Sequence, residues 1–467
     1  MRAPRSSTTS TTIIPEDVVK PWKLPPQQTY IFTNANVVDP VTGSVFAASA
    51  VKLSGGRVEC VHRSSHDDST STLLRSLAVA DDAITVDLAG KYLCPGLIDC
   101  HVHLTSVPGE ADLRSSMNLA PDVSLLRQPF VCKAMLERGY TSVRDCGGAS
   151  LSLKEAIADG VFPGPRLFIS GHGLSQTGGH GDRRGAHEPG AVGCGCGGGA
   201  EAGMMAVCDG VPECLRASRE QLRTGADFIK IMVGGGVASP TDALESTQFT
   251  AEEIAAIASV AEAAGTIVTA HAYTPRAIRQ AVENGVRGIE HGNLIDGPTA
   301  AFMAKHGVFL TPTLVTYQAM ADPRYSAFLP AENQRKNQMV LRRGLESLQL
   351  AQEAGVTVCL GSDLLSMMGA EQLKEFGLRG RVLGAADVLR QATINPAKML
   401  GQAQFLGQVG EGFAADILVL NSNPLEDITV FERPGEHLLA VIKDGRVYSS
   451  RWSKLPEDVT PPSGLLE

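Results

Sequence analysis

The sequence predicts an α/β protein in which a (β/α)8 TIM barrel is combined with a small β-sandwich domain built from both chain ends. Eight apolar, strand-like runs alternate with helical stretches through the middle of the chain, and eight parallel βα units close into a barrel. Short strand-like segments punctuated by Gly, Pro and Asn flank this middle region on both sides. The length of 467 residues suits a decorated barrel with a second, smaller domain.

The strand-like runs of the middle region set the order of the predicted barrel. They cover residues 93–103, 141–148, 166–171, 227–236, 266–272, 288–293, 309–314 and 356–363. Helical stretches between them include residues 121–139, 211–225, 250–265 and 274–285. A glycine-rich stretch from Gly185 to Gly210 follows the third run, and we expect it to be a mobile loop on the face of the barrel that carries the active site.

Three regions follow from this pattern. Residues 1–28 are predicted to form a loose N-terminal arm, residues 29–93 and 404–467 a composite β-sandwich domain, and residues 94–403 the catalytic barrel. Strands of the composite domain are expected within residues 29–43, 49–61, 83–90, 415–424 and 438–450.

The composition is that of a compact protein without a strongly charged partner. Hydrophobic residues make up 43% and charged residues 19% of the chain. The formal net charge is −9 and there is no basic block, which argues against nucleic acid and against an anionic membrane surface as partners. No window reaches the ~20 apolar residues of a membrane span. The N-terminus lacks the apolar core of a signal peptide, which weakly favours a cytoplasmic protein and leaves a processed, secreted form open.

The ten cysteines are scattered through the chain, several of them in core strand runs, and we interpret most of them as buried free thiols. Cys194 and Cys196 stand two apart in the glycine-rich stretch. Neither has a partner pair at zinc-finger spacing, so we interpret them as loop thiols and not as a metal clip.

Polar residues fall at the ends of the predicted barrel strands. His101 and His103 end the first run, and the fourth, fifth, sixth and eighth runs end at Lys230, His271, His291 and Asp363. The carboxyl ends of all barrel strands meet at one pocket, so residues far apart in the sequence become neighbours there. Two histidines two apart in a strand point the same way, which gives a metal two imidazole ligands.

Each of these residues has an ordinary interpretation when taken alone. A single strand histidine is usually a hydrogen-bonded core or surface residue, an interpretation that fits His62, His66, His306 and His437. A lysine can mark the point where a strand meets solvent, and a lone Gly-Ser-Asp is usually a turn. The joint placement of four histidines, one lysine and one aspartate at predicted strand ends favours a metal site.

Further residues are candidates for substrate binding. His180 lies just beyond the third run and could donate to a substrate carbonyl or its tetrahedral oxyanion. Arg183 or Arg184 could hold a substrate carboxylate bidentately, although a solvated arginine pair in a loop is the more common role. Tyr273 and Tyr317 also follow barrel strands and are either pocket-lining residues or rim aromatics.

The segment Pro95-Gly96-Leu97-Ile98-Asp99-Cys100-His101-Val102-His103 resembles the PGLID-x-H-x-H signature of the metal-dependent amidohydrolase superfamily. The later His271, His291 and Asp363 fit the order of its ligands, and the resemblance extends to the closing segment from Ile394 to Leu420. Residues 178–182, 228–240 and 270–275 look most like the branch with imidazolonepropionase-like enzymes, Xaa-Pro and related dipeptidases, and above all fungal ochratoxinase. Gly235 stands where relatives commonly have Ser, which is expected to alter the pocket and to leave the metals unaffected.

The resemblance implies two divalent metal ions, with zinc as the expected metal. Lys230 matches the lysine that family members carboxylate with CO2, which turns a cationic side chain without a lone pair into an anionic bridge between the metals. His101, His103 and Asp363 are expected on one metal and His271 and His291 on the other. Divalent ions lower the pKa of bound water towards ~7, and Asp363 is expected to pass its proton to the leaving nitrogen.

The function implied is cleavage of an amide bond to a C-terminal amino acid, as in an N-acyl amino acid or a dipeptide, and including ochratoxin A. His180 is expected to assist Asp363 in catalysis, with Arg183, Tyr273 and Tyr317 in substrate binding. One alternative is an Xaa-Pro or other dipeptidase. Another is a mononuclear deaminase-type enzyme, against which Lys230 counts. A non-catalytic scaffold is disfavoured by the complete ligand set, and the resemblance implies a homo-oligomer.

Overall fold

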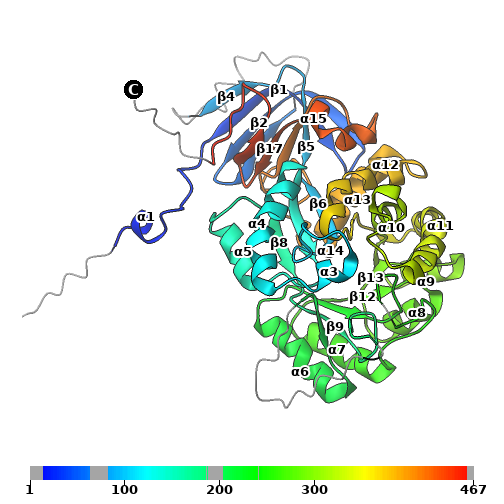
Figure 1. Ribbon diagram of the computed structural model, residues 1–467. Coiled ribbons are helices and arrows are strands. Elements are labelled where there is room, and N and C mark those ends of the chain that lie inside the picture. The colour runs from blue at the N-terminus through cyan, green and yellow to red at the C-terminus, as the bar shows by residue number, and fades with distance from the viewer. Residues whose placement is uncertain (1–13, 64–82, 186, 188–202, 240, 460–467) are drawn as a thin grey trace, which may run out of the picture.

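The computed structural model describes residues 14–63, 83–185, 187, 203–239 and 241–459 (Figure 1). The first described segment carries only the four-residue helix α1 (Glu16–Val19) before the first strand. Both chain ends then contribute strands to one eight-stranded sheet, whose path runs β18-β17-β16-β5-β1-β2-β3 with β4 paired to β1. These strands are β1 (Tyr30–Asp39), β2 (Ser44–Ser54), β3 (Arg57–His62), β4 (Ile84–Asp87), β5 (Tyr92–Pro95), β16 (Ile417–Leu420), β17 (Leu438–Lys443) and β18 (Arg446–Ser450).

The two ends of the chain meet where β5 pairs antiparallel with β16, with Cys94 opposite Leu418. In Figure 1 the blue strands of the N-terminal part lie beside the orange and red strands of the C-terminal part. Phe32, Leu53, Leu93 and other fully buried side chains fill a core that belongs to this sheet. Strands from both ends thus join in one sheet, and its packing as a two-layered sandwich stays a prediction.

The middle of the chain forms two parallel sheets. One has the order β10-β9-β11-β12-β13-β14-β15 and the other the order β6-β7-β8. Their strands are β6 (Leu97–Val102), β7 (Tyr140–Asp145), β8 (Arg166–Ile169), β9 (Gly173–Ser175), β10 (Met205–Val207), β11 (Ile229–Met232), β12 (Val268–Ala272), β13 (Gly288–His291), β14 (Phe309–Thr311) and β15 (Thr357–Val358). The predicted parallel arrangement is confirmed, whereas the structure has two hydrogen-bonded sheets where the sequence predicted one closed barrel.

Backbone hydrogen bonds connect both edge strands of the three-stranded sheet, β6 and β8, to segments of the seven-stranded sheet. The amide of Asp227, just before β11, donates to the carbonyl of Ile169 at the end of β8 (2.7 Å). On the other side the amide of Cys100 in β6 donates to the carbonyl of Leu360, just after β15 (2.8 Å). The carboxyl ends of the strands of both sheets therefore face the same region.

Helices surround the parallel strands (Figure 1). They are α3 (Leu113–Met117), α4 (Pro121–Glu137), α5 (Leu151–Ala158), α6 (Gly210–Arg223), α7 (Ala251–Ala263), α8 (Pro275–Glu283), α9 (Gly297–Lys305), α10 (Leu314–Ala321), α11 (Ala331–Glu353), α12 (Lys374–Gly380), α13 (Ala385–Ala392) and α14 (Ile394–Met399). The short α15 (Pro434–His437) lies beside β17 of the eight-stranded sheet, and 3-10 turns stand at Pro323–Tyr325, Ser366–Glu371 and Ile428–Glu432. Helix α7 begins at a capping box in which Thr250 and Glu253 satisfy each other's backbone amides. No helix among the described residues is long and apolar enough to cross a membrane.

The predicted loop from Gly185 to Gly210 is wrong at its C-terminal end. Residues 205–207 form β10, which pairs parallel with Gly173–Ser175, and Gly210 already begins α6. Residues 186 and 188–202, including Cys194 and Cys196, lie outside the described residues, as does His66. All cysteines in the described part of the chain are free, and all but Cys60 are buried.

Candidate metal centre and active site

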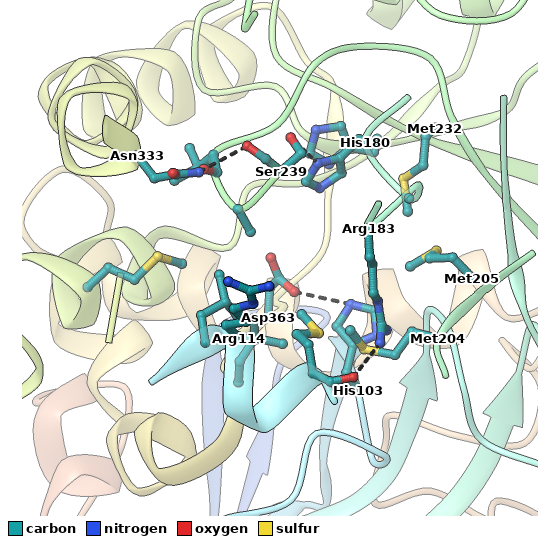
Figure 2. Close-up of a pocket in the computed structure, with 18 of the residues that line it drawn as sticks. His103, Arg114, His180, Arg183, Met204, Met205, Met232, Ser239, Asn333 and Asp363 are labelled. Atoms are coloured by element: carbon teal, nitrogen blue, oxygen red, sulfur yellow. Dashed lines mark hydrogen bonds and ion pairs between the residues drawn. The ribbon is translucent and has the colours of Figure 1, made fainter. Parts of the chain in front are cut away.

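A cavity of about 720 Å³ lies at the carboxyl ends of the parallel strands (Figure 2). Every residue that the sequence analysis singled out for metal or substrate binding lines this cavity: His101, His103, His180, Arg183, Arg184, Lys230, His271, Tyr273, His291, Tyr317 and Asp363. The first two residues come from β6 and its end, and Lys230, His271 and His291 from β11, β12 and β13. Asp363 follows β15 by five residues, so the fold brings the whole predicted set together.

His101, His103 and Asp363 form a compact group that could hold a metal ion. One ligand atom from each lies within 4.8 Å of the others. The carboxylate oxygen Oδ1 of Asp363 lies 3.4 Å from Nε2 of His101 and 3.3 Å from Nε2 of His103. The backbone amide of Asp363 donates to the carbonyl of His101 (2.8 Å), which fixes the aspartate beside the histidine pair.

Hydrogen bonds select which nitrogen of each imidazole faces the centre. Nδ1 of His103 lies 3.0 Å from the carbonyl oxygen of Gly147, and Nε2 of His271 lies 3.1 Å from that of Gly235. A carbonyl only accepts, so these nitrogens carry the protons and leave Nε2 of His103 and Nδ1 of His271 with free lone pairs. Metal-binding histidines are oriented in this way by a hydrogen bond on their other nitrogen.

His291 is held by two hydroxyl groups. Its Nδ1 lies 2.7 Å from Oγ1 of Thr313 and 3.0 Å from the hydroxyl oxygen of Tyr317. The hydroxyl of Tyr317 lies a further 2.9 Å from that of Tyr273. Both tyrosines are buried, so they stand in the wall of the cavity and do not form its rim. Tyr317, on α10, thereby supports a candidate ligand in addition to lining the pocket.

Burial favours the neutral form that a metal needs in three of the four histidines; in His103 burial lowers the pKa, but Asp363 and Asp145 outweigh this effect and raise it. Burial lowers the pKa of His101 to about 4 and the pKa values of His271 and His291 well below their usual range. Imidazole binds metals in its neutral form. Burial also lowers the pKa of Lys230. It raises the pKa of Asp363, but His101, His103 and His291 outweigh this effect, so the pKa of that carboxyl is below its usual value.

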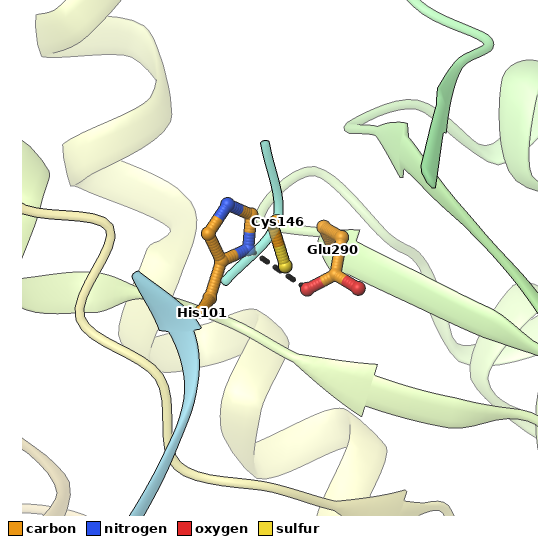
Figure 3. Close-up of side chains that lie close together, drawn as sticks. All are labelled: His101, Cys146 and Glu290. Atoms are coloured by element: carbon orange, nitrogen blue, oxygen red, sulfur yellow. Dashed lines mark hydrogen bonds and ion pairs between the residues drawn. The ribbon is translucent and has the colours of Figure 1, made fainter. Parts of the chain in front are cut away.

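Glu290 is a buried carboxylate that the sequence analysis missed (Figure 3). Its Oε2 accepts from Nδ1 of His101 (2.8 Å), and its Oε1 accepts from the guanidinium of Arg144 (2.6 Å). Arg144 also donates to the carbonyl of Cys100 (2.5 Å). The pKa of Glu290 is well below its usual value, because Arg144 and His101 outweigh the effect of burial. Glu290 therefore fixes His101 with Nε2 free, and a carboxylate inside an otherwise apolar strand was the available signal.

Asp99 is a second buried carboxylate, and it links the segment that carries His101 to the segment that carries Asp363. Its oxygens accept from the amide of His101 (3.0 Å) and from the amide and hydroxyl of Ser362 (3.1 and 2.6 Å). Ser362 directly precedes Asp363. One side chain in β6 thus holds the backbone on either side of the histidine–aspartate group.

Two of the candidate ligands have a strained backbone conformation. His291 has a φ of 73° and Asp363 a φ of 51°, and Thr313 beside them has a φ of 46°. Residues other than glycine rarely adopt these values, which cost about 1–3 kcal/mol each and cluster at functional sites. The packing around the cavity therefore holds two ligands in conformations that the isolated chain would avoid.

The loop after β11 explains the glycine at position 235. Its carbonyl oxygen receives the proton of His271 Nε2, and a Cβ atom at this position would lie 1.8 Å from the carbonyl oxygen of Ala243. A serine would therefore displace the loop that orients His271. The expectation that this position leaves the metals unaffected is not supported by these contacts.

The arginines at the mouth of the cavity differ in what they already bind. Arg184 forms a two-point ion pair with Asp182 (2.7 and 2.5 Å), which occupies its guanidinium. Arg183 donates to the carbonyl of Met117 at the end of α3 (2.7 Å). Arg114, also on α3, lines the same cavity and was not identified from the sequence. Figure 2 shows Arg114 and Arg183 in the same pocket as Asp363.

His180 stands in the cavity wall against the metal-ligand candidates. Its ring stacks on that of His271 with centroids 4.2 Å apart. Nδ1 lies 2.9 Å from the hydroxyl oxygen of Ser239, and the backbone amide donates to Gln248 (2.8 Å). The position fits the expected contact with a substrate amide.

Residues 92–448 match the amidohydrolase family, and the chain therefore belongs to that family. It is 34% identical to ochratoxinase from Aspergillus niger over 371 residues, which are 76% of this chain and 75% of that protein. The crystal structure of A. niger ochratoxinase aligns with a TM-score of 0.78 at 30% identity, covering 93% of this chain and 99% of that one. The resemblance stated from the sequence is confirmed.

Two further solved structures are similar to this chain. A prolidase in complex with N-methylphosphonate-L-proline is 40% identical, with a TM-score of 0.83 and coverage of 91% of this chain and 100% of that one. A Xaa-Pro dipeptidase with methionine bound in its active site is 26% identical, with a TM-score of 0.76 and the same coverage. The family and these relatives make the chain a hydrolase of amide or peptide bonds.

Proposed function

We propose that this protein is a binuclear metal-dependent hydrolase that cleaves the amide bond to a C-terminal amino acid, including the phenylalanine amide of ochratoxin A. The observation that carries the proposal is the convergence of four buried imidazoles, Asp363 and the buried Lys230 in one cavity. The proposal includes closure of the two parallel sheets into one barrel, since backbone bonds link both edge strands of the three-stranded sheet to the seven-stranded sheet.

The donor set fits two divalent ions. His101, His103 and Asp363 would hold one, and His271 and His291, whose ring centroids lie 4.6 Å apart, would hold the other. Lys230, carboxylated by CO2, would bridge them. An unmodified ammonium group would be a poor neighbour for two cations, whereas a carbamate supplies anionic oxygens. Zinc is the metal we propose, because nitrogen and oxygen ligands of this kind suit it.

Bound divalent ions would supply Lewis-acid activation of water and of the scissile carbonyl. The protein's own residues then handle the proton. Oδ1 of Asp363 is directed at the histidine pair, so Oδ2 is the atom that takes a proton from the attacking water and passes it to the leaving nitrogen. His180 contacts the amide from the opposite wall of the cavity.

We assign recognition of the free α-carboxylate of the substrate to the arginines at the mouth of the cavity. Arg183 retains guanidinium N–H groups beyond the one bound to Met117, and Arg114 lies in the same lining. Five methionines line the remaining wall, at positions 117, 204, 205, 232 and 320. Methionine adapts to irregular apolar groups, and a volume of about 720 Å³ is ample for a drug-sized ligand. A bulky acyl group therefore fits.

The metal assignment is tested by elemental analysis of metal-replete protein together with the structure of Lys230. We expect about two divalent ions per chain and density for a carbamate. A stable, active enzyme with one ion would contradict the bridge, as would an unmodified ammonium group beside two bound metals.

The substrate assignment is tested by comparing N-acyl-phenylalanine with its methyl ester, with ochratoxin A alongside. The ester lacks a charge-assisted contact worth ~1.5–3 kcal/mol, so kcat/KM should fall by about 10- to 150-fold. Equal rates for acid and ester would contradict the carboxylate contact. Absence of ochratoxin A cleavage would reduce the assignment to an amide hydrolase of other substrates.

A second candidate is an Xaa-Pro dipeptidase, favoured by the 40% identity to the prolidase. The bond before proline is a tertiary amide without an N–H group, whereas the phenylalanine amide of ochratoxin A is secondary. Measuring kcat/KM for Ala-Pro, Met-Pro and ochratoxin A on one preparation separates the candidates. A preference for the dipeptides would replace the leading assignment while leaving the metal chemistry unchanged.

A further inference from the structure

Three side chains form a hydrogen-bonded series that runs from the loop after β11 into the wall of the cavity. Oδ1 of Asp242 contacts Oγ of Ser239, and Oγ of Ser239 lies 2.9 Å from Nδ1 of His180. Ser239 is buried, and the side chain of Asp242 is only 4% exposed. Figure 2 shows His180 and Ser239 together on one side of the pocket.

The direction of these hydrogen bonds follows from what each group can do. The Asp242 carboxylate only accepts, so the hydroxyl of Ser239 donates to it. The carbonyl of Gly236, 3.1 Å from the same hydroxyl, is a competing acceptor, but a charged acceptor at shorter distance is the stronger one. The oxygen of Ser239 then accepts from Nδ1–H of His180. Nε2 is left unprotonated, so it can accept a hydrogen bond from the N–H of a substrate amide and cannot donate to the substrate carbonyl or its oxyanion, which is the role that the sequence analysis expected.

The series is held at both ends by one further side chain. Gln248 donates to Oδ2 of Asp242 (2.7 Å), and its own oxygen accepts from the backbone amide of His180 (2.8 Å). The amide of Gly236 also donates to Oδ2 (3.1 Å). His180 is thus fixed through its ring and through its backbone by the same segment, residues 236–248.

Side chains of helix α11 hold this segment through hydrogen bonds to its backbone carbonyls. Lys336 donates to the carbonyls of Gly236, Ser239 and Asp242 (3.2, 3.2 and 2.6 Å), and Asn333 donates to the carbonyl of Ser239 (3.0 Å). Lys336 Nζ also lies 3.6 Å from Oδ1 of Asp242 and balances its charge. A buried carboxylate with this many partners is a satisfied network, which rigidifies what it holds.

The absence of a side chain at Gly236 lets the ring of His180 lie directly on the loop. A Cβ atom at Gly236 would come within 1.9 Å of Nδ1 and 2.0 Å of Cε1 of His180. The ring also stacks on His271 at an interplanar angle of 27°. These contacts hold the imidazole in one position, and the hydrogen bond to Ser239 sets its tautomer.

We propose that Ser239 and Asp242 are positioning residues that fix His180 as the Nδ1–H tautomer and so hold Nε2 at the scissile amide of the substrate. The inference rests on the proposed amide hydrolysis, because His180 is the group that touches the substrate. Ser239 and Asp242 act only through it.

The test combines a double-mutant cycle with a spectrum, on full-length zinc-loaded protein. Ser239→Ala should lower kcat for N-acyl-phenylalanine about 10-fold or more, as loss of a partner that orients an imidazole does, while KM changes less than about 2-fold. In a His180→Gln background the same change should have no further effect. Ser246→Ala is the matched control, since this hydroxyl of the same loop contacts only the carbonyl of Ala243, and it should behave as wild type.

The spectrum separates this inference from the proposed function because it needs no turnover. A downfield proton resonance that disappears in His180→Gln is the Nδ1–H of His180, and it should shift or vanish in Ser239→Ala and in Asp242→Asn. Its presence in a protein that cleaves no amide would refute the function and keep the positioning. Independent kinetic effects of Ser239→Ala and His180→Gln, or a resonance unchanged by Ser239→Ala, would refute the positioning.

Discussion

Replacement of Glu290 by glutamine is the sharpest probe of how the candidate metal site is built. Glutamine keeps the shape of the side chain and removes its charge. In the native protein the carboxylate accepts from His101 (2.8 Å) and from Arg144 (2.6 Å), and all three side chains are buried. The substitution therefore leaves Arg144 without its anion and offers His101 an amide in place of a carboxylate.

Two effects of the change can be estimated separately. Removing one partner of a buried ion pair leaves an uncompensated charge and typically costs about 3–5 kcal/mol of folding free energy. Weakening the carboxylate behind a metal-binding histidine typically costs about 10- to 100-fold in metal affinity or activity. Among the described residues the Glu290 side chain is hydrogen-bonded to His101 and Arg144 and to no predicted ligand of the second metal, so the loss of affinity should fall mainly on one of the two ions.

The assay is a zinc titration with a competing chelator, alongside urea unfolding of the metal-free protein. Glu220→Gln is the control, since Glu220 pairs with Arg223 on the exposed face of α6 and its loss should change neither quantity measurably. Two zinc ions bound by Glu290→Gln with wild-type affinity would refute the orienting role of Glu290. Wild-type stability would refute the reasoning about the buried charge.

The remaining predictions concern the bridge, the base and the pH response. Lys230→Ala should abolish activity and lower the metal content to one ion per chain or fewer, and small carboxylic acids should restore part of the activity; an active, binuclear Lys230→Ala enzyme would exclude the bridge. Asp363→Asn should lower kcat by about 100-fold or more with little change in KM, because its proton transfer occurs in the transition state; a near-normal kcat would assign the base to another group. Metal-free protein should lose stability as the pH falls from 7 to 5. Burial lowers the pKa of His101 from its ordinary 6.5 to about 4, so the unfolded chain takes up the proton first and His101 alone contributes a loss of about 2 kcal/mol at pH 5. Urea unfolding of wild type and His101→Gln at both pH values isolates this contribution from that of Asp99 and Asp145, whose pKa values burial raises; an identical pH dependence in the two proteins would contradict it.

The candidate ligands could be found in the sequence because strand ends in a parallel α/β fold meet on one side. His101, His271 and His291 lie within one residue of the ends of their strands, and the apolar runs alone indicated that they would converge; Lys230, predicted to end its run, is the second residue of β11. The extra strands β9 and β10 gave no such signal. They are three residues long, separated by a glycine-rich stretch, and defined by long-range pairing of Met205–Val207 with Gly173–Ser175 and of Leu174 with Ile231.

The residues that support the candidate ligands were harder to predict from the sequence, because their roles depend on long-range contacts. Glu290 could have been noticed in the sequence, since a carboxylate within a buried strand needs a partner. Nothing in the sequence identified Arg144 as that partner. Asp242 and Ser239 sit in a loop where polar residues are common, and only the hydrogen bonds to His180 and Gln248 distinguish them. In the sequence Arg114 likewise cannot be distinguished from the other arginines. Only the position of α3 beside the cavity identifies it.

The charges of the site indicate why an anionic substrate would be preferred. Glu290 and Arg144 neutralise each other behind His101, so they leave no net charge for the metals to balance. The four imidazoles are neutral ligands, and Asp363 carries one negative charge. Carboxylation would change Lys230 from one positive to one negative charge, giving the ligands a total of about −2 against +4 from two divalent ions. The surplus positive charge would lie in a buried cavity where water screens it poorly. Arg183 and Arg114 at the mouth add to it. A neutral amide would not be attracted by this positive potential. An amide whose leaving group carries a free α-carboxylate would be attracted before any specific contact forms.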